Sequence, residues 1–455
     1  MINNNLPPHL TALKASWSWA KLGDLIGKNG IFVDGDWVES KDQDPNGEVR
    51  LIQLADIGEI EFRNKSDRYL TYKKALELNC TFLEKGDLLI ARMPDPLGRA
   101  CIFPIKGKEK YVTVVDVAIV RVDEKKVNND FLCYIINAPQ SRDNISSLQS
   151  GSTRRRISRK NLGSINFPLP PLPEQKKIVE KIEELFSGLD SGVASLKKAK
   201  EQLRLYRQSV LAFAFSGRLV GEVGSRQPDL PSGRSAVGKM EMLKAAEPNV
   251  LYKSNDLPDG WKWVKLGEVC KQIIGGGTPS TKVEKYWNGN IDWITSADIY
   301  GLRDIRPRKK ITKEAIKNSA TNLVPKGTII VVTRVSLGRL AIADNDICFS
   351  QDSQGLILKK EIVNTNYVLW FLSSATQIFK YKNRGTTIKG VTKKQLSDLE
   401  FVLPPLNQQT QIVEEIEKRF SEADNLEKAI DDSLEKSEAL RQSILKQAFE
   451  GRFIR

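Results

Sequence analysis

The feature that most constrains this 455-residue chain is a proline-rich turn followed by a long amphipathic segment, which occurs twice. FPLPPLPEQKKIVEKIEELF begins at Phe167, and FVLPPLNQQTQIVEEIEKRF begins at Phe401. The likeness continues through LRLYRQSVLAFAFSGRL and SEALRQSILKQAFEGRF, and matched residues such as Gln175 and Gln409 keep one constant offset. A constant offset over such a length indicates an internal duplication, which predicts a pseudo-twofold molecule.

The duplication extends into the regions that precede these segments. WSWAKLGDL, from Trp17, matches WKWVKLGEV, from Trp261, and EKGDLLIARMPDPLGRACI resembles PKGTIIVVTRVSLGRLAI. Runs such as YVTVVDVAIV and GTIIVV predict strands, whereas NYVLWFLSSATQIF predicts a helix. We therefore predict an α+β fold in which two mixed α/β domains are joined by two long antiparallel helices.

Composition and repeat boundaries divide the chain into five segments. The stretch GEVGSRQPDLPSGRSAVGKMEM is rich in Gly, Ser and Pro without periodicity, which is typical of a linker. In chain order, the predicted segments are a first mixed domain at 1–166, a first helical region at 167–220, a linker at 221–256, a second mixed domain at 257–400 and a second helical region at 401–455.

The helical regions carry a heptad pattern, which predicts a coiled coil. The first seam consists of residues spaced by seven: Ile182, Leu189, Leu196, Leu203 and Val210. One helix over 174–216 would be ~64 Å long at 1.5 Å per residue. Each helix packed only on its own domain is the alternative, but two matching helices of this length each need a long partner. An antiparallel pair is favoured because the linker then delivers the second domain near the end of the first helix.

Charge indicates the kind of partner. The formal net charge is +14, which favours a polyanion such as nucleic acid, although a generally basic surface is the alternative. The five cysteines form no Cys-x-x-Cys pair, so reduced thiols in a cytoplasmic protein are expected. No run approaches the ~18 apolar residues that span a bilayer, and no membrane association is expected.

Catalytic motifs are missing from the sequence. His9 is the only histidine, which leaves no histidine-based triad or zinc site. GRSAVGKM nearly spells a phosphate-binding loop, but Met240 replaces the hydroxyl that would bind magnesium. Asp34 with Glu39 and Lys41 imitates a nuclease set, a pattern common in charged loops. We predict a chain that catalyses nothing and holds no cofactor or metal.

Two basic loops are the strongest candidates for contact with DNA. GSTRRRISRK in the first half corresponds to RGTTIKGVTKK in the second, and both combine cations with Gly, Ser or Thr, which suit phosphates and guanine edges. A third candidate, around Thr295 and Ser296, is equally compatible with a structural turn. The predicted DNA-binding residues are Arg92, Arg99, Arg154, Arg155, Arg156, Lys160, Thr295, Ser296, Arg334, Arg339, Arg384, Thr386, Thr387 and Lys389.

The repeated LPPLPEQKKIVEKI and LPPLNQQTQIVEEI stretches, with RQSVLAFAFSGRL and RQSILKQAFEGRF, resemble the conserved regions of type I restriction–modification specificity subunits. WKWVKLGEV, GGGTPSTK, YWNGNIDWITSADI and GTTIKGVTKKQL resemble their target recognition domains. The resemblance covers nearly the whole chain. The first half departs from it, because GKNGIFVDGDWVES and LIQLADIG stand where GGTPS and WIT would be expected.

The resemblance implies a mechanism. Each target recognition domain would read one half-site of a bipartite asymmetric site in double-stranded DNA, and the helical pair would fix the spacer. Two methyltransferase subunits holding S-adenosylmethionine would flip and methylate adenines. Two restriction subunits would use ATP and Mg to translocate and cut DNA.

Two other classes of protein remain as alternatives. A self-contained DNA methyltransferase or nuclease is disfavoured by the missing cofactor and metal motifs. A non-specific architectural DNA-binding protein is disfavoured because non-specific binding needs no divergence between two domains on a repeated frame.

Overall fold

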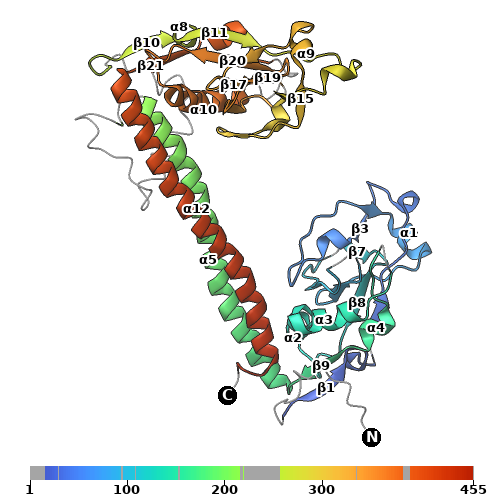
Figure 1. The fold of residues 1–455 in the computed structure, drawn as a ribbon. Helices are drawn as coiled ribbons and strands as arrows, with labels where there is room; N and C mark the ends of the chain where they lie inside the picture. Colours follow the sequence, from blue (N-terminus) through green and yellow to red (C-terminus); the bar gives the residue numbers. More distant parts are fainter. Residues whose placement is uncertain are drawn as a thin grey trace. The chain divides into compact units, whose positions relative to one another are not determined.

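The computed structural model describes residues 16–215, 219 and 257–453, apart from 29, 94–95, 108, 152–153, 335 and 383–389, and the predicted linker at 221–256 lies outside them. The chain forms two compact units. Unit 1 contains residues 1–196 and 432–455, and unit 2 contains residues 197–431. Each unit therefore combines one mixed domain with parts of both long helices (Figure 1).

The two long helices are α5 (Leu172–Phe215) and α12 (Leu406–Phe449), each of 44 residues. Both begin directly after a Pro-Pro pair, where the missing N–H of proline costs little because the first turn has no intrahelical acceptor for it. α5 continues through Gly188 and Gly192, so these glycines do not end the helix.

The helices run antiparallel within unit 2. Lys200 of α5 forms an ion pair with Asp431 of α12 at 2.7 Å, and Arg207 forms one with Asp424 at 2.5 Å. Moving seven residues toward the C-terminus of α5, from Lys200 to Arg207, therefore moves the partner seven residues toward the N-terminus of α12, from Asp431 to Asp424. This confirms the predicted antiparallel direction.

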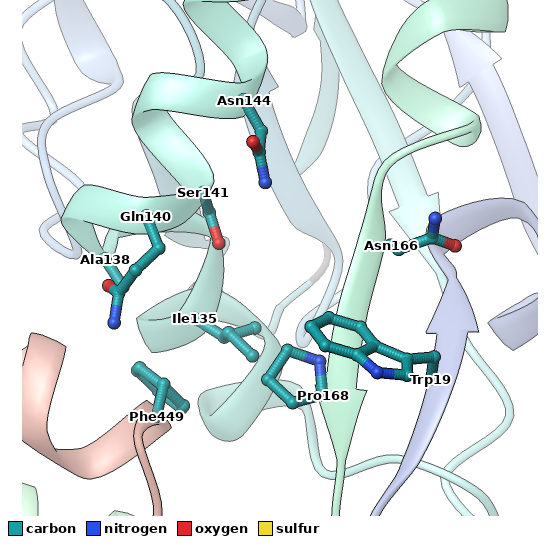
Figure 2. Close-up of a pocket in the computed structure, with 9 residues that line it drawn as sticks. All are labelled: Trp19, Ile135, Ala138, Gln140, Ser141, Asn144, Asn166, Pro168 and Phe449. Carbon is teal, nitrogen blue, oxygen red and sulfur yellow. The ribbon is translucent and has the colours of Figure 1, made fainter. Parts of the chain in front are cut away.

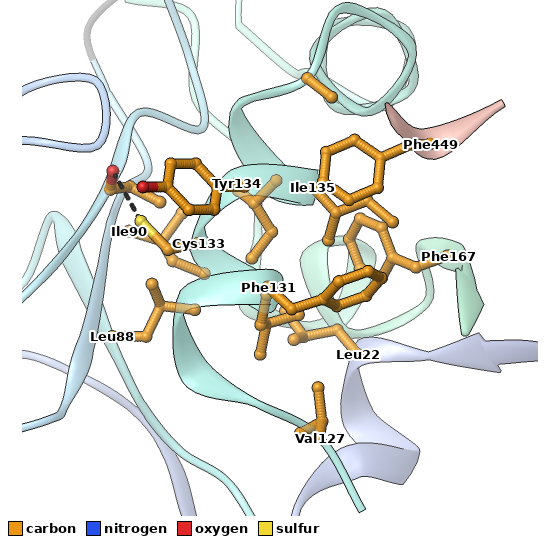
Figure 3. Close-up of a cluster of buried hydrophobic side chains, with 14 of the residues drawn as sticks. Leu22, Leu88, Ile90, Val127, Phe131, Cys133, Tyr134, Ile135, Phe167 and Phe449 are labelled. Carbon is orange, nitrogen blue, oxygen red and sulfur yellow. Dashed lines mark hydrogen bonds between the residues drawn. The ribbon is translucent and has the colours of Figure 1, made fainter. Parts of the chain in front are cut away.

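The same direction holds within unit 1. Arg441 of α12 forms an ion pair with Asp190 of α5, and its guanidinium lies 4.4 Å from the centre of the Phe186 ring. Further along α12, Phe449 lies edge-to-face with Phe131 of the mixed domain, with ring centres 5.3 Å apart (Figure 3). The end of α12 is therefore part of the core of unit 1.

The end of α5 has the equivalent place in unit 2. Phe215 contacts Tyr367 and Phe371 of α10 (Thr365–Lys382), with ring centres 5.3 and 5.7 Å apart. Each mixed domain thus has its core completed by the terminal turns of a long helix from the other half of the sequence.

Each mixed domain is built on a four-stranded antiparallel sheet. In unit 1 the order is β2 (Ile31–Asp34), β8 (Val117–Arg121), β5 (Leu88–Ala91) and β6 (Ala100–Ile102). In unit 2 it is β11 (Cys270–Gly275), β20 (Ser353–Leu358), β17 (Ile329–Val332) and β18 (Leu340–Ile342). All four residues of β5 are buried, because Leu88 and Ile90 face one hydrophobic cluster and Leu89 and Ala91 face another.

A second sheet accompanies each of these, with three strands in unit 1 and four in unit 2. In unit 1 it is β4 (Tyr69–Leu70), β3 (Val49–Ile52) and β7 (Lys110–Thr113); in unit 2 it is β15 (Lys309–Ile311), β12 (Ile291–Ile294), β19 (Ile347–Phe349) and β16 (Leu323–Val324). The β3–β7 and β12–β19 pairs are both parallel. The order β4–β3–β7 matches β15–β12–β19, and β16 is an additional edge strand of unit 2, so the two mixed domains share most of their topology.

Antiparallel strand pairs bring together the two ends of each mixed domain: β1 (Ser18–Lys21) with β9 (Asn166–Leu169), and β10 (Lys262–Lys265) with β21 (Glu400–Leu403). The remaining elements of unit 1 are η2 (Leu22–Leu25), η3 (Ser40–Asp42), η4 (Leu54–Asp56), α1 (Tyr72–Glu77), α2 (Asn129–Asn137), α3 (Pro139–Ser147) and α4 (Arg159–Gly163). Those of unit 2 are α8 (Leu266–Val269), η6 (Glu284–Tyr286), η7 (Ser296–Asp298), β13 (Ile299–Gly301), β14 (Asp304–Ile305), α9 (Lys313–Lys317) and α11 (Lys393–Ser397).

A small cavity of about 20 Å³ lies where α2, α3 and the β1–β9 pair meet the end of α12 (Figure 2). Trp19, Pro168 and Phe449 are among its lining residues. Gln140 also lines it and donates a hydrogen bond from Nε2 to the carbonyl of Lys446 at 3.1 Å. A cavity of this size holds about one water molecule, so it is a packing gap rather than a ligand site.

Candidate nucleic-acid interface

The basic loop of unit 1 is tied to the end of β5 by Arg92. The backbone N–H of Ile157 donates to the Arg92 carbonyl at 3.1 Å, and the Arg92 guanidinium donates to the carbonyls of Ile157 and Val115 at 3.4 and 2.5 Å. The same guanidinium pairs with Asp34 at 3.3 Å, and only 13% of the Arg92 side chain is exposed. Arg92 therefore fixes the position of the loop, while its contact with DNA stays a prediction.

The loop itself displays its arginines. Ser150 and Arg156 exchange backbone hydrogen bonds of 2.8 and 3.0 Å, which close the base of the loop. Gly151 has φ +92°, and a Cβ there would lie 2.6 Å from the Arg154 carbonyl, so the turn requires glycine. Arg154, Arg155 and Arg156 are exposed. Lys160, in α4, is exposed as well.

The corresponding loop of unit 2 is tied in the same way to a different residue. The N–H of Val391 donates to the Thr333 carbonyl at 2.8 Å, as Ile157 does to Arg92. Thr333 therefore occupies the place of Arg92, and the exposed Arg334 follows one position later. Four predicted contact residues, Arg384, Thr386, Thr387 and Lys389, lie outside the described residues.

Arg339 is held at the start of β18. Its Nη1 donates to the carbonyls of Ser296 and Ile299 at 2.9 and 3.2 Å. It follows Gly338, whose φ of +86° matches the φ of +76° at Gly98. The glycine of the Leu-Gly-Arg sequence therefore has the same left-handed backbone conformation in both domains.

Arg99 follows Gly98 in unit 1 and lies in a cationic neighbourhood. Partial burial lowers the pKa of Arg99, and the nearby Arg63 lowers it further, while Glu59 acts in the opposite direction. Glu59 also pairs with Arg142 at 3.4 Å. An anion placed beside Arg99 and Arg63 would relieve the repulsion between them, which is consistent with the predicted phosphate contact.

Thr295 and Ser296 form part of a structural turn. The Thr295 hydroxyl donates to Asp298 at 2.9 Å, and its N–H donates to the same carboxylate at 2.8 Å. Ser296 is 6% exposed. Burial raises the pKa of Asp298, but the bonds from Thr295 and Arg308 outweigh it and hold the pKa below its usual value. These contacts favour the structural-turn interpretation of this stretch.

The equivalent turn in unit 1 lies in LIQLADIG, the stretch that stands where WIT would be expected. Gln53 directly precedes η4 as Thr295 directly precedes η7, and the Gln53 N–H donates to Asp56 at 2.7 Å. Asp56 is fully buried and also accepts from the N–H of Ser66 at 2.8 Å. The stretch LIQLADIG therefore forms the turn that WITSADI forms in unit 2. The shared Ala-Asp pair was the available signal.

These features define a class of protein: two domains of one topology, each with a basic loop tied to the same sheet position, built on two shared helices. The family described as "Type I restriction modification DNA specificity domain" matches residues 16–201 and again residues 258–436. The chain belongs to this family. Within the described ranges, none of the helices has the length and apolar character needed to cross a membrane.

Relatives are about a quarter identical to this chain over the aligned residues. The type I restriction enzyme EcoBI specificity subunit of Escherichia coli is 27% identical over 344 residues, covering 74% of this chain and 68% of that protein. The StySPI specificity subunit of Salmonella potsdam is 28% identical over 345 residues, covering 72% and 66%. The matched region thus spans about two thirds of these relatives.

Solved structures show the same fold over nearly the full chain. A chain from a study of complex assembly and conformational transition in the type I R-M system has a TM-score of 0.70 at 19% identity, covering 97% of this chain and 99% of that chain. The HsdS subunit from Thermoanaerobacter tengcongensis has a TM-score of 0.56 at 19% identity, covering 97% and 98%.

Proposed function

We propose that this chain is the sequence-specific DNA-recognition subunit of a type I restriction–modification complex, and that it reads a bipartite asymmetric site. The observation that carries the proposal is the equivalence of the Ile157–Arg92 and Val391–Thr333 tethers. They attach Ile157 of GSTRRRISRK and Val391 of RGTTIKGVTKK to the same place on the same fold, and the two stretches differ in sequence. One frame that presents two different sets of side chains is suited to reading two different half-sites.

The recognition itself belongs to the exposed cations. Arg154, Arg155 and Arg156 have the reach and fork geometry for guanine edges or phosphates. The partly buried Arg92 and the turn residues Thr295 and Ser296 support the loops that carry such contacts. α5 passes without interruption from unit 1 into unit 2, and we propose that α5 and α12 together fix the unread spacer.

Chemistry is assigned to partner subunits. We propose two methyltransferase subunits, which hold S-adenosylmethionine and flip the target adenines, and two restriction subunits, which use ATP and Mg. The complex would act on cytoplasmic DNA. The described residues support this assignment because their exposed arginines lie on loops that are hydrogen-bonded to a sheet. Such arginines can bind and position DNA while partner subunits carry out the reaction.

Mapping methylated adenines in host DNA tests the proposal. The expected motif has two different short half-sites separated by a fixed spacer, and the methylation should disappear when this chain is deleted. One continuous motif, or a perfect palindrome, would contradict the bipartite asymmetric site. The purified chain alone should transfer no methyl group from labelled S-adenosylmethionine, which separates it from a self-contained enzyme. Competition by unrelated DNA at rising salt separates it from an architectural binder.

A further inference from the structure

A second cationic surface lies in unit 2, outside the predicted contact residues. We call residues 299–310 the wing; it contains β13, β14 and the first residues of β15. Its sequence, IYGLRDIRPRKK, has five cations and one acid. The exposed cations are Arg303, Arg306, Arg308, Lys309 and Lys310.

The wing cations have internal partners but remain exposed. Arg306 pairs with Asp304 at 2.7 Å and its side chain is 67% exposed. Lys310 pairs with Asp292 at 3.3 Å and is 58% exposed. The Arg306–Asp304 pair is exposed on both sides, and exposed pairs contribute little to stability, so Arg306 can turn to a phosphate without disturbing the fold. Asp292 is only 15% exposed, but it also accepts a hydrogen bond from Asn345 Nδ2 at 2.8 Å and so keeps a partner when Lys310 turns away.

Aromatic rings hold two of these cations in place. The Arg306 guanidinium lies 4.7 Å from the centre of the Tyr300 ring, and Tyr300 is 59% exposed. Lys309 lies 5.1 Å from the centre of the Trp287 ring. Cations interleaved with exposed aromatic side chains are typical of nucleic-acid surfaces, where tyrosine hydroxyls also bond phosphates.

The wing adjoins Arg339, one of the predicted DNA-contact residues. Arg339 donates to the Ile299 carbonyl at the start of the wing, and the N–H of Ile342, in edge strand β18, donates to the Leu302 carbonyl at 3.0 Å. Arg303 pairs with Glu417 of α12 at 2.6 Å, which ties the wing to the long helix. The wing is therefore a fixed extension of the sheet that carries Arg339.

Unit 1 lacks this charge. The N–H of Arg63 donates to the Asp56 carbonyl as that of Arg306 donates to the Asp298 carbonyl, so residues 57–68 are the counterpart of the wing. IGEIEFRNKSDR has three cations and three acids, a net charge of 0, against five minus one, or +4, in the wing. The fold alone therefore does not require a basic segment here, and the charge favours binding of a polyanion.

We propose that the wing binds the phosphate backbone of double-stranded DNA beside the half-site that unit 2 reads. This rests on the proposed function, but it concerns a sequence-independent contact made by unit 2 alone. Because each phosphate contact releases a condensed counterion, the wing should contribute to the salt dependence of binding to any duplex.

The test measures binding of the full chain to a labelled duplex of unrelated sequence at several salt concentrations. The variant Arg306→Gln with Lys309→Gln and Lys310→Gln should flatten the slope of log Kobs against log salt by about 0.9 for each phosphate that the wing no longer neutralises. A charge-conserving variant, Arg306→Lys with Lys309→Arg and Lys310→Arg, should keep the slope and shows that the effect is not misfolding.

The matched control removes three exposed cations at the end of the sheet that lies away from Thr333: Lys271 at the start of β11, Lys326 before β17 and Lys360 after β20. The control variant is Lys271→Gln with Lys326→Gln and Lys360→Gln. It changes net charge equally and should alter the slope by less than about 0.9, the value for a single phosphate.

An equal effect of both triple variants, or no effect of the wing variant, overturns the inference. Unchanged DNA binding with abolished methylation in the assembled complex also overturns it, because the wing would then be a protein-docking surface. If the proposed function itself is wrong, the wild-type protein should instead bind all DNA sequences without preference, and this result can be told apart from the others.

Discussion

Gln175 and Gln409 make the same three hydrogen bonds in the two units. Gln175 Nε2 donates to the carbonyls of Pro170 and Lys126 at 2.8 and 3.2 Å, and its Oε1 accepts from the N–H of Asn128 at 2.8 Å. The residue is fully buried in the first turn of α5. It therefore joins the start of the long helix to the segment that leads into α2.

Gln409 repeats this in unit 2. It donates to the carbonyls of Pro404 and Ile362 at 2.8 and 3.1 Å and accepts from the N–H of Asn364 at 2.7 Å. It too is fully buried. The duplicated helix starts thus preserve an internal clamp, which holds each mixed domain at a defined orientation to its helix.

Gln175→Glu should destabilise unit 1. A carboxylate lacks the two N–H donors, so the buried Pro170 carbonyl and the partly buried Lys126 carbonyl would both lose the hydrogen bond from residue 175. The expected decrease in free energy of unfolding is about 1–3 kcal/mol for each orphaned group, measured by urea unfolding. Gln208→Glu, at an exposed position of α5, is the control and should change stability by less than about 0.5 kcal/mol. Equal stability of the two variants would refute the clamp.

Much of this frame follows from local sequence pattern. The paired prolines, the heptads and the constant offset between Gln175 and Gln409 predicted two long antiparallel helices, because these signals depend on periodicity and topology alone. The strands over 329–332 and 117–121 were equally visible as β-branched runs. The fold class was therefore accessible without coordinates.

Side-chain roles within the site were less accessible. Arg92 looks from sequence like an exposed loop cation, but its guanidinium meets three backbone and carboxylate partners that come from distant segments. The wing is absent from the predicted contact residues, although four of its five cations stand together in RPRKK, because this basic sequence has no counterpart in the first half. Only the fold shows that Arg306 lies over the Tyr300 ring and Lys309 over the Trp287 ring.

Asp36 makes stability depend on pH. Burial raises its pKa to about 6, although hydrogen bonds from the N–H of Thr81, at 3.2 and 3.1 Å, and from Cys80 oppose the change. Because the folded pKa lies above the ordinary value of 3.8, the folded state holds the proton more tightly. Stability should therefore decline as pH rises through about 4 to 6 and stay lower above that range.

Asp36→Asn removes the charge but keeps an acceptor for Thr81. It should raise the free energy of unfolding by about 1 kcal/mol near neutral pH, a value reduced for partial solvent exposure, and by almost nothing below about pH 4. Thermal melts across this range, with the exposed Asp24→Asn as the charge-matched control, measure the difference. A constant gap between Asp36→Asn and wild type at every pH would contradict the assignment.

Arg155→Ala and Arg384→Ala should each weaken binding to the cognate site while leaving the fold intact. Removing an arginine that bonds a base edge would cost about 1–3 kcal/mol, whereas removing one that bonds a phosphate would cost less and reduce the salt slope by about one. The control is Arg204→Ala on α5, where the side chain is 58% exposed and pairs with Glu201. If both loop variants bind like wild type at every salt concentration, neither loop reads DNA.

The last prediction concerns the spacer. α5 and α12 pass from one unit to the other after Leu196 and after Asp431. Inserting four helical residues at both places adds about one turn, or ~6 Å, to each helix. If the helices fix the distance between the half-sites, the preferred spacer should lengthen by one or two base pairs at ~3.4 Å each, with both half-site sequences unchanged.

Binding to duplexes that differ only in spacer length measures this shift. Four residues added to α5 alone break the alignment of ion pairs such as Lys200–Asp431 and Arg207–Asp424, so this control should lose affinity for every spacer rather than gain a new preference. An elongated variant that folds and still prefers the original spacing would show that another part of the complex sets the distance. A shifted optimum with unchanged half-sites would assign the distance to the helices and the sequence to the loops.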